Sequence, residues 1–372
     1  MTLIPQTDPH ASYVEHKAAI DAALARVLDS GWYILGREAE AFEARFAELI
    51  GVGHAIGCGN GTDALELALR ACGIGAGDLV FTVSHTAVAT VAAIERAGAT
   101  AVLADIEENG YCMDPDALDA ALKAAPKGRP AAVMPVHLYG EPAAMVEIVA
   151  LARARGMRVI EDCAQSHGAH YQGVTTGSIG DFGCFSFYPT KNLGALGDAG
   201  AVVTGDAELA AAAREIREYG WRDRYVSAVV GINSRLDPIQ AGVLNAKIDT
   251  LSADNARRQA IAARYNAELA GLPLAVPGTR NSSTHVYHQY VIRTKKRDGL
   301  REHLHQAQIG TGIHYPLPVH LHPAYRGRVL VGPTGLCRSE AAAREILSLP
   351  MYPQLSGKTV DRVIAEIRRF FL

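Results

Sequence analysis

The sequence lacks the features that would place it in a membrane, on a nucleic acid or outside the cell. No run approaches the roughly 18 apolar residues that a transmembrane helix needs. Its 36 basic and 39 acidic residues leave a net charge of −3, which argues against a general nucleic-acid or membrane-surface role. The segment Met1–Pro9 shows no basic stretch with an apolar one behind it, so no signal peptide is indicated. We therefore expect a soluble, cytoplasmic protein.

Cysteine and histidine patterns typical of metal or disulfide frameworks are also missing. No two cysteines stand at CxxC spacing, and several lie in apolar runs, which indicates buried thiols in a reducing compartment. His314, His320 and His322 stand in a proline-broken loop and do not follow helical or zinc-finger spacing. The sequence thus predicts no metal site. The cysteines are Cys58, Cys72, Cys112, Cys163, Cys184 and Cys337.

The sequence does contain a regular alternation of segments. Its 372 residues, 49% of them hydrophobic, suffice for two domains. From about Ala55 to Gly205, short apolar strands alternate with helical stretches of roughly ten residues or more, which predicts βαβ units and a mostly parallel sheet. A long charged helical stretch, 238–269, with a break near 250, follows. We predict an α/β protein with a large domain over residues 1–250 and a smaller one over 251–372.

Lys191 is the most informative residue. It leaves the apolar strand around Phe185–Phe187 and enters a glycine-rich loop that includes Gly194 and Gly197. Such a site can desolvate the amine and lower its pKa, as a Schiff-base lysine requires. The alternative is a solvated surface charge.

Asp162 supplies a matching acid at the end of the apolar strand around Val159 and Ile160. Ligands of open parallel sheets bind beyond the carboxyl ends of the strands. An acid there can hold a pyridine nitrogen protonated while the lysine holds an aldehyde, which is the minimum needed for pyridoxal phosphate (PLP). Gln165 could bond the ring's phenolic oxygen, and the alternative for Asp162 is a helix cap.

Two further loops complete the candidate site. Gly57–Asp63 is a glycine loop that opens a helix and could present backbone N–H groups to a phosphate, or could be an ordinary turn capped by Thr62. Asp237 and Pro238 begin a helix, but helix capping leaves Asn233 and Arg235 just before them unexplained.

Together these segments resemble the DegT/DnrJ/StrS family of PLP-dependent nucleotide-sugar aminotransferases, of fold type I. The resemblance extends over nearly the whole chain, with the motifs in the family's order. The motifs are Asn60-Gly61-Thr62-Asp63-Ala64-Leu65, Ser84-His85-Thr86, Pro135-Val136-His137-Leu138-Tyr139-Gly140, Glu161-Asp162-Cys163-Ala164-Gln165-Ser166-His167-Gly168-Ala169, Phe185-Ser186-Phe187-Tyr188-Pro189-Thr190-Lys191-Asn192, Gly231-Ile232-Asn233-Ser234-Arg235 and Ile313-His314-Tyr315-Pro316.

The resemblance implies a mostly parallel seven-stranded sheet and a homodimer with composite active sites. Lys191 would anchor the cofactor, Asp162 would pair with its ring nitrogen and Gln165 would lie near its ring oxygen. The phosphate would be bound by Gly61, Thr62, Asp63 and Ser186 of one chain and by Asn233 of the second subunit. Many relatives carry an aromatic residue where this chain has Ala87, so we expect His85 to stack on the ring.

The His314–Tyr315 loop is more similar to the family branch that aminates C3 of dTDP-linked 3-keto-6-deoxyhexoses, with glutamate as amino donor. The expected product is a dTDP-3-amino-3,6-dideoxyhexose. The expected substrate-binding residues are Tyr188, Tyr219, Arg222, Arg235, His314 and Tyr315, with Arg224 a further cation for the diphosphate. Two alternatives stay open: amination at C4, and a PLP-binding regulator without turnover.

Overall fold

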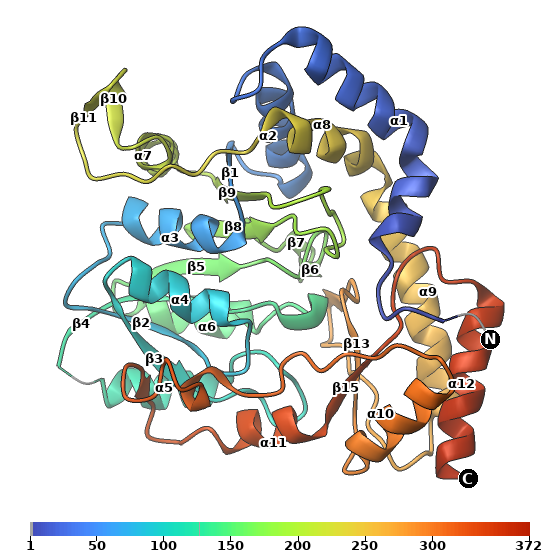
Figure 1. Ribbon diagram of the computed structural model, residues 1–372. Helices are drawn as coiled ribbons and strands as arrows, with labels where there is room; N and C mark the ends of the chain where they lie inside the picture. The colour runs from blue at the N-terminus through green and yellow to red at the C-terminus, as the bar shows by residue number, and fades with distance from the viewer. Residues whose placement is uncertain (1–2, 126) are drawn as a thin grey trace.

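The computed structural model describes residues 3–125 and 127–372 and contains one large twisted sheet flanked by helices (Figure 1). The strand order is β1-β9-β8-β5-β4-β2-β3-β14. β1 pairs antiparallel with β9 and β9 with β8, while the remaining pairs are parallel. The strands are β1 (His54–Cys58), β2 (Asp78–Val83), β3 (Thr100–Ala104), β4 (Arg129–Val133), β5 (Arg158–Asp162), β8 (Phe182–Ser186), β9 (Gly200–Thr204) and β14 (Leu330–Val331).

The predicted mostly parallel α/β sheet is therefore confirmed, with one addition. Seven strands come from the first 204 residues, as expected, and β14 is an eighth that the C-terminal segment adds beside β3. A strand of two residues is too short to show a periodic pattern, so β14 could not be predicted from its residues.

Helices cover both faces of the sheet, because the apolar side of each helix and the apolar residues of the strands bury each other. Leu65 of α3 and Ile94 of α4 belong to one core cluster, and Leu118 of α5 and Ile148 of α6 to the cluster on the opposite face. The helices of this part are α1 (Pro9–Ser30), α2 (Arg37–Ile50), α3 (Gly61–Ala71), α4 (Val88–Arg96), α5 (Pro115–Lys123), α6 (Met145–Arg153), α7 (Ala207–Arg217) and α8 (Pro238–Lys247).

The long helical stretch expected over 238–269 breaks near residue 250, as expected. α8 ends at Lys247, a turn of 3-10 helix spans Ile248–Thr250, and α9 continues from Leu251 to Leu269. α9 runs along one side of the molecule toward the C-terminal elements (Figure 1). These are α10 (Arg297–Gln306), α11 (Cys337–Glu345), α12 (Gly357–Phe371) and the antiparallel pair β13 (Tyr290–Arg293) and β15 (Ile346–Leu349).

The expected domain boundary at residue 250 stays a prediction, and the chain beyond it serves two cores. Leu300, Leu347 and Val363 share a cluster with α9, whereas Val319 and Leu336 pack into the core of the large sheet.

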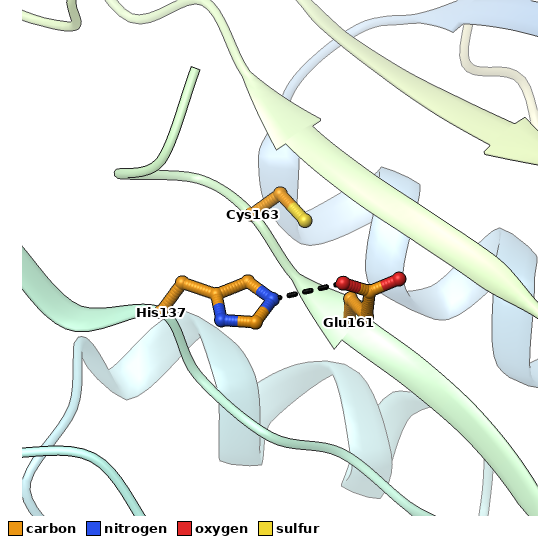
Figure 2. A group of neighbouring side chains, drawn as sticks. All are labelled: His137, Glu161 and Cys163. Carbon is orange, nitrogen blue, oxygen red and sulfur yellow. Dashed lines mark hydrogen bonds and ion pairs between the residues drawn. The ribbon is translucent and has the colours of Figure 1, made fainter. Parts of the chain in front are cut away.

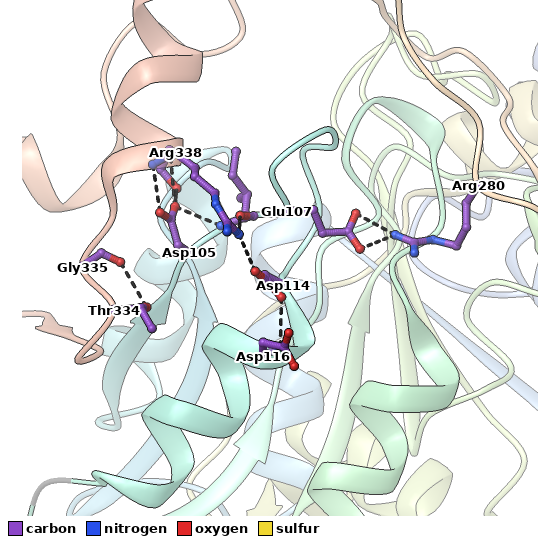
Figure 3. A network of polar contacts seen from close by, with 10 residues as sticks. Asp105, Glu107, Asp114, Asp116, Arg280, Thr334, Gly335 and Arg338 are labelled. Carbon is purple, nitrogen blue, oxygen red and sulfur yellow. Dashed lines mark hydrogen bonds and ion pairs between the residues drawn. The ribbon is translucent and has the colours of Figure 1, made fainter.

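A polar network joins two C-terminal segments to the stretch between β3 and α5 (Figure 3). Both carboxylate oxygens of Glu107 bind Arg280 at 2.6 and 2.7 Å, and Arg338 pairs with Asp114.

Short strand pairs complete the fold. β10 (Trp221–Asp223) and β11 (Val226–Ser227) form a hairpin that projects at the corner opposite α9 (Figure 1). β12 (Ser283–Thr284), β6 (His170–Tyr171) and β7 (Val174–Thr175) form a small antiparallel sheet. Among the described residues, no helix is both long enough and apolar enough to cross a bilayer.

Candidate active site

Lys191 opens onto a cavity of about 550 Å³ at the carboxyl ends of β5 and β8, which we call the lysine cavity. The N-termini of α3 and α4 and two C-terminal segments close its other sides. A volume in this range suits one small organic ligand. Its lining residues are Asn60, Gly61, Thr62, Leu65, Thr86, Ala87, Ala89, Arg96, Val136, Asp162, Ala164, Gln165, Ser186, Tyr188, Thr190, Lys191, Asp198, His288, Gln289, His314 and Tyr315.

The Lys191 amine has the electrostatic character expected of a nucleophile. Burial lowers its pKa to about 8, and the nearby Asp162 carboxylate opposes that shift. Its Nζ has no hydrogen-bond or ion-pair partner among residues 3–125 and 127–372. A lysine at this pKa is partly deprotonated near neutral pH and can both give and take a proton.

Asp162 and Gln165 are fixed on the wall of the same cavity. Asp162 is buried at the end of β5, where Thr90 Oγ1 donates to Oδ2 at 2.8 Å and the Ala164 N–H to Oδ1 at 3.2 Å. Burial raises the pKa of Asp162, and the hydrogen bonds from Thr90 and Ala164 oppose the rise. Gln165 accepts the Tyr139 N–H at 2.7 Å and donates to the Tyr315 hydroxyl at 3.2 Å.

The N-terminus of α3 faces the cavity with free backbone donors. The Asn60 side chain caps α3 by accepting the Asp63 N–H at 2.9 Å, so that donor is already satisfied. The N–H groups of Gly61 and Thr62 have no acceptor in the part of the chain that the structure describes. With the helix dipole behind them, they form a ready anion site.

Gly61 lets β8 approach this helix end. A Cβ at Gly61 would lie 2.6 Å from the Ser186 Cβ, a distance that real side chains do not tolerate. Glycine therefore brings the Ser186 hydroxyl next to the free N–H groups.

His85 and Ala87 are arranged differently from the expectation. His85 is buried outside the cavity lining, with Nε2 at 2.8 Å from the Tyr139 hydroxyl and its ring beside Tyr111. Ala87 lines the cavity instead. His85 therefore fixes Tyr139, and the structure gives its ring no face on the lysine cavity.

Asp63 and the segment 233–235 form a second unit beside the cavity. Asp63 accepts the Ser234 hydroxyl at 2.7 Å and pairs with Arg96 at 3.0 Å, while Ser234 accepts the Gly59 N–H at 2.9 Å. The Asp63 side chain thus connects the glycine loop to Ser234 through hydrogen bonds, and it does not line the cavity. Asn233 is exposed.

The expected substrate-binding residues fall into two groups. Tyr188, His314 and Tyr315 line the lysine cavity, and burial raises the pKa of Tyr315 to about 12. Arg222 and Arg235 line a separate hollow of about 970 Å³ around the β10–β11 hairpin, which we call the arginine hollow. Tyr219 stands at its margin, with its ring 5.0 Å from that of Trp221. The single chain does not bring the two groups together.

Several cavity residues were missed from the sequence. His288 and Gln289 are buried and lie immediately before β13, and the His288 Nδ1 has no partner among the described residues. Two polar residues within the apolar stretch 286–292 were the signal that could have identified them. Arg96 also lines the cavity, but nothing in its helical context distinguishes it from a surface arginine.

One buried group has the composition of a metal site but not its chemistry (Figure 2). The Glu161 oxygens accept hydrogen bonds from His137 Nε2 at 3.0 Å and from the backbone of Gly177, Ile179 and Gly180 at 2.7–2.9 Å. His137 Nδ1 accepts the Ala143 N–H at 3.0 Å, and burial raises the pKa of the Cys163 thiol well above its usual value. Both Glu161 oxygens are therefore saturated by protein donors, and the group is structural.

Comparisons with known proteins give a consistent result. Residues 14–368 match the profile of the DegT/DnrJ/EryC1/StrS aminotransferase family. The chain is 47% identical over 369 residues to the dTDP-3-amino-3,4,6-trideoxy-alpha-D-glucose transaminase of Streptomyces venezuelae, covering 99% of this chain and 96% of that protein. It is 42% identical to the UDP-N-acetyl-3-dehydro-alpha-D-glucosamine 3-aminotransferase of Acidithiobacillus ferrooxidans, with 99% and 98% covered. The crystal structure of S. venezuelae DesV in complex with a ketimine intermediate matches with a TM-score of 0.95 and 46% identity, covering 100% of this chain and 99% of that one.

Proposed function

The chain belongs to the DegT/DnrJ/EryC1/StrS aminotransferase family, and on that premise we propose that it moves an amino group from glutamate to C3 of a dTDP-linked 3-keto-6-deoxyhexose. The product would be a dTDP-3-amino-3,6-dideoxyhexose. The protein is a PLP-dependent transaminase of fold type I.

The lysine cavity fits the cofactor on its own chemistry. It contains a buried amine and two N–H groups at a helix end that have no partner among residues 3–125 and 127–372, together with a buried carboxylate. Lys191 would hold the aldehyde carbon, Asp162 the protonated ring nitrogen and Gln165 the ring oxygen. Gly61, Thr62 and Ser186 would bind the phosphate. PLP, when bound, supplies the aldehyde that takes up the amino group and a ring that accepts electrons.

The residues of this chain supply the proton transfers. The Lys191 amine, with its pKa lowered to about 8, would take the proton from Cα of glutamate and pass it to the cofactor. In the second half of the cycle the same amine would carry a proton in the reverse direction, from the cofactor to C3 of the sugar. Asp162 would stay ionised and hold the ring nitrogen protonated. Borohydride reduction of the loaded protein followed by peptide mapping should place the cofactor on Lys191, and an adduct on any other lysine would overturn the anchor.

The single observation that carries the C3 assignment is the full-length similarity to two relatives whose names place the new amine at C3. Their nucleotides differ, dTDP in one and UDP in the other, so the position of amination is the feature they share. His314 and Tyr315 line the same cavity as Lys191, where they could contact the sugar.

The test is to incubate the protein and glutamate separately with dTDP-linked 3-keto and 4-keto sugars and to locate the new amine by NMR. We expect amination of the 3-keto sugar alone, because buried polar donors reject a substrate that leaves them unpaired by factors of up to roughly 10⁴–10⁵. Exclusive amination at C4 would overturn the regiochemistry. Turnover of glutamate with neither sugar would overturn the acceptor, with a UDP-linked 3-keto sugar as the next substrate to try.

The active form we propose is a homodimer with composite sites. Large apolar side chains are exposed together near the arginine hollow, including Trp32 at 64%, Tyr225 at 71% and Val230 at 83%. Exposure of this extent in one region is typical of a surface that another protein covers. In such a dimer, Asn233 of one chain would bind the phosphate of the cofactor in the other chain's lysine cavity. The six free thiols fit a reducing compartment, and a cytoplasmic location stays a prediction.

A further inference from the structure

Asp162 does not stand alone on the cavity wall, because two threonine hydroxyls form a chain behind it. Thr90 Oγ1 donates to Asp162 Oδ2 at 2.8 Å, and Thr86 Oγ1 lies 2.9 Å from Thr90 Oγ1. All three residues are buried. We propose that Thr90, supported by Thr86, is a positioning residue that orients the Asp162 carboxylate and holds it ionised for the cofactor ring. The inference rests on the proposed role of Asp162.

The direction of this chain follows from proton counting. A hydroxyl has a single proton, and an ionised carboxylate can only accept. The Thr90 proton therefore goes to Asp162, so Thr86 must donate to Thr90. Each bond polarises the next, which makes Thr90 a stronger donor than an isolated hydroxyl.

Helix α4 fixes both hydroxyls. Thr86 precedes the helix and Thr90 lies in its first turn, four residues later, which places both on one side of the helix. The N-cap residue Ala87 has no side chain to cap the helix, and Ala87 and Ala89 line the lysine cavity. The positive end of α4 thus faces the carboxylate that Thr90 binds, and a helix N-terminus favours negative charge.

The Thr90 hydroxyl counteracts the effect of burial on the Asp162 carboxylate. Burial favours the neutral form of Asp162 and so raises its pKa, while the Thr90 and Ala164 donors favour the ionised form. The other groups that interact electrostatically with Asp162 are His137 from the segment after β4, Lys191 from the loop after β8, Cys163 directly after β5, Cys184 from β8 and Tyr315 from the C-terminal segment.

Thr90 is thus a strong neutral donor to Asp162. Lys191 gives up its charge when it reacts, whereas the Thr90 hydroxyl is permanent.

The test compares Thr90→Val, which keeps the shape and removes the donor, with Thr90→Ser, which keeps the donor. The measurements are the PLP dissociation constant by equilibrium dialysis and kcat with glutamate and a keto sugar. A hydrogen bond to a charged group is worth roughly a ten- to hundredfold effect, so Thr90→Val should weaken PLP binding by that factor and lower kcat. Thr90→Ser should stay within about threefold of wild type, and Thr86→Val should show the same losses in weaker form.

Thr82→Val is the matched control for loss of a buried threonine hydroxyl. Thr82 is equally buried and donates to the Met134 carbonyl at 2.9 Å, away from Asp162. The Thr82→Val variant should lower thermal stability, as Thr90→Val does, but should leave PLP affinity unchanged. Wild-type PLP affinity in Thr90→Val, or equal losses in Thr90→Ser, would overturn the proposal.

A double-mutant cycle with Asp162→Asn separates this inference from the proposed function. If Thr90 acts through Asp162, the double variant Asp162→Asn/Thr90→Val should bind PLP as well as Asp162→Asn alone. If the two residues act independently, the losses of PLP affinity in the two single variants should add in the double variant. Full additivity would overturn the inference. If Asp162→Asn alone leaves affinity and rate unchanged, the assigned role of Asp162 fails first. If Asp162→Asn lowers PLP affinity and kcat but Thr90→Val changes neither, only the positioning role of Thr90 fails.

Discussion

At the scale of single residues, the two groups proposed to carry the chemistry, Lys191 and Asp162, are buried where their charged forms are disfavoured. Burial lowers the pKa of Lys191 to about 8 and raises that of Asp162, and each group partly offsets the other. An amine buried without a fixed hydrogen-bond partner is a cost to the fold, and such costs are typical of functional sites.

That cost gives a pH-dependent prediction for protein freed of cofactor. Because the folded pKa of Lys191 is about 8 and the ordinary value is 10.5, the unfolded state binds more protons between these values. The penalty is therefore complete below pH 8 and disappears as the pH rises toward 10.5. Lys191→Met should raise the free energy of unfolding near pH 7 by up to roughly 3 kcal/mol, at about 1.4 kcal/mol per pKa unit.

Urea unfolding of both proteins from pH 7 to pH 10 measures this difference, which should shrink as the pH rises. Burial also lowers the pKa of Lys247 to about 8, but Lys247 is present in both proteins and cancels in the difference. A difference that does not change with pH would show that Lys191 is not buried as a cation.

Asp162→Asn should fold normally and lose at least about two orders of magnitude in kcat, because the amide cannot hold the ring nitrogen protonated. Circular dichroism checks the fold and steady-state kinetics the rate. Near-wild-type turnover would mean that the carboxylate serves only as the acceptor for Thr90 and the Ala164 N–H.

At the scale of secondary-structure elements, the site depends on how strand ends are tied together. Glu161, next to Asp162 on β5, accepts N–H groups from the turn 177–180 that leads into β8. His137 lies on the segment after β4. Its side chain donates to the Glu161 carboxylate, and its backbone N–H donates to the backbone carbonyl of Asp162 at 3.1 Å. The strands that carry the acid and the lysine are thereby held in register by one buried carboxylate.

Glu161→Gln should therefore destabilise the protein by roughly 3–5 kcal/mol, since an amide would turn its own NH₂ toward backbone donors and leave them unpaired. Urea unfolding at pH 7 measures it. Glu147→Gln, an exposed glutamate on α6, is the control and should change stability by less than about 0.5 kcal/mol. A loss below about 1 kcal/mol for Glu161→Gln would refute the role of this carboxylate.

At the scale of the whole molecule, one chain separates the groups that the proposed composite site would bring together. The lysine cavity holds the residues proposed to bind the cofactor, while Arg222, Arg235 and the exposed Asn233 lie on the side of the β10–β11 hairpin. A symmetric pair of chains could bring each hairpin side to the partner's cavity.

Subunit mixing tests this arrangement. Lys191→Ala and Asn233→Ala chains, each inactive alone, should regain up to about a quarter of wild-type activity when mixed in equal amounts, because half of the dimers carry one intact site. The control mixture, Lys191→Ala with Asp162→Asn, should stay inactive, since both residues serve the cavity of their own chain. Absence of recovery in the first mixture, after subunit exchange is verified by mass spectrometry, would show that Asn233 does not act across subunits.

The sequence by itself determined the features that depend on neighbouring residues. Apolar runs alternating with helical stretches predicted the mostly parallel sheet, because periodicity is a local property. Lys191, Asp162 and the loop at Gly61 were predicted as site residues for a similar reason, since each stands near a strand end or helix start that a few flanking residues define. The order of these motifs identified the family.

Only the tertiary structure decided which side chains share a space. It buried His85 against Tyr139 and left Ala87 at the cavity, brought His288 in from the segment before β13, and set Thr90 behind Asp162. It also added β14 to the sheet across more than two hundred residues of sequence. These contacts arise from the packing of distant segments into one core, and no local pattern of residues encodes which partner a side chain will meet.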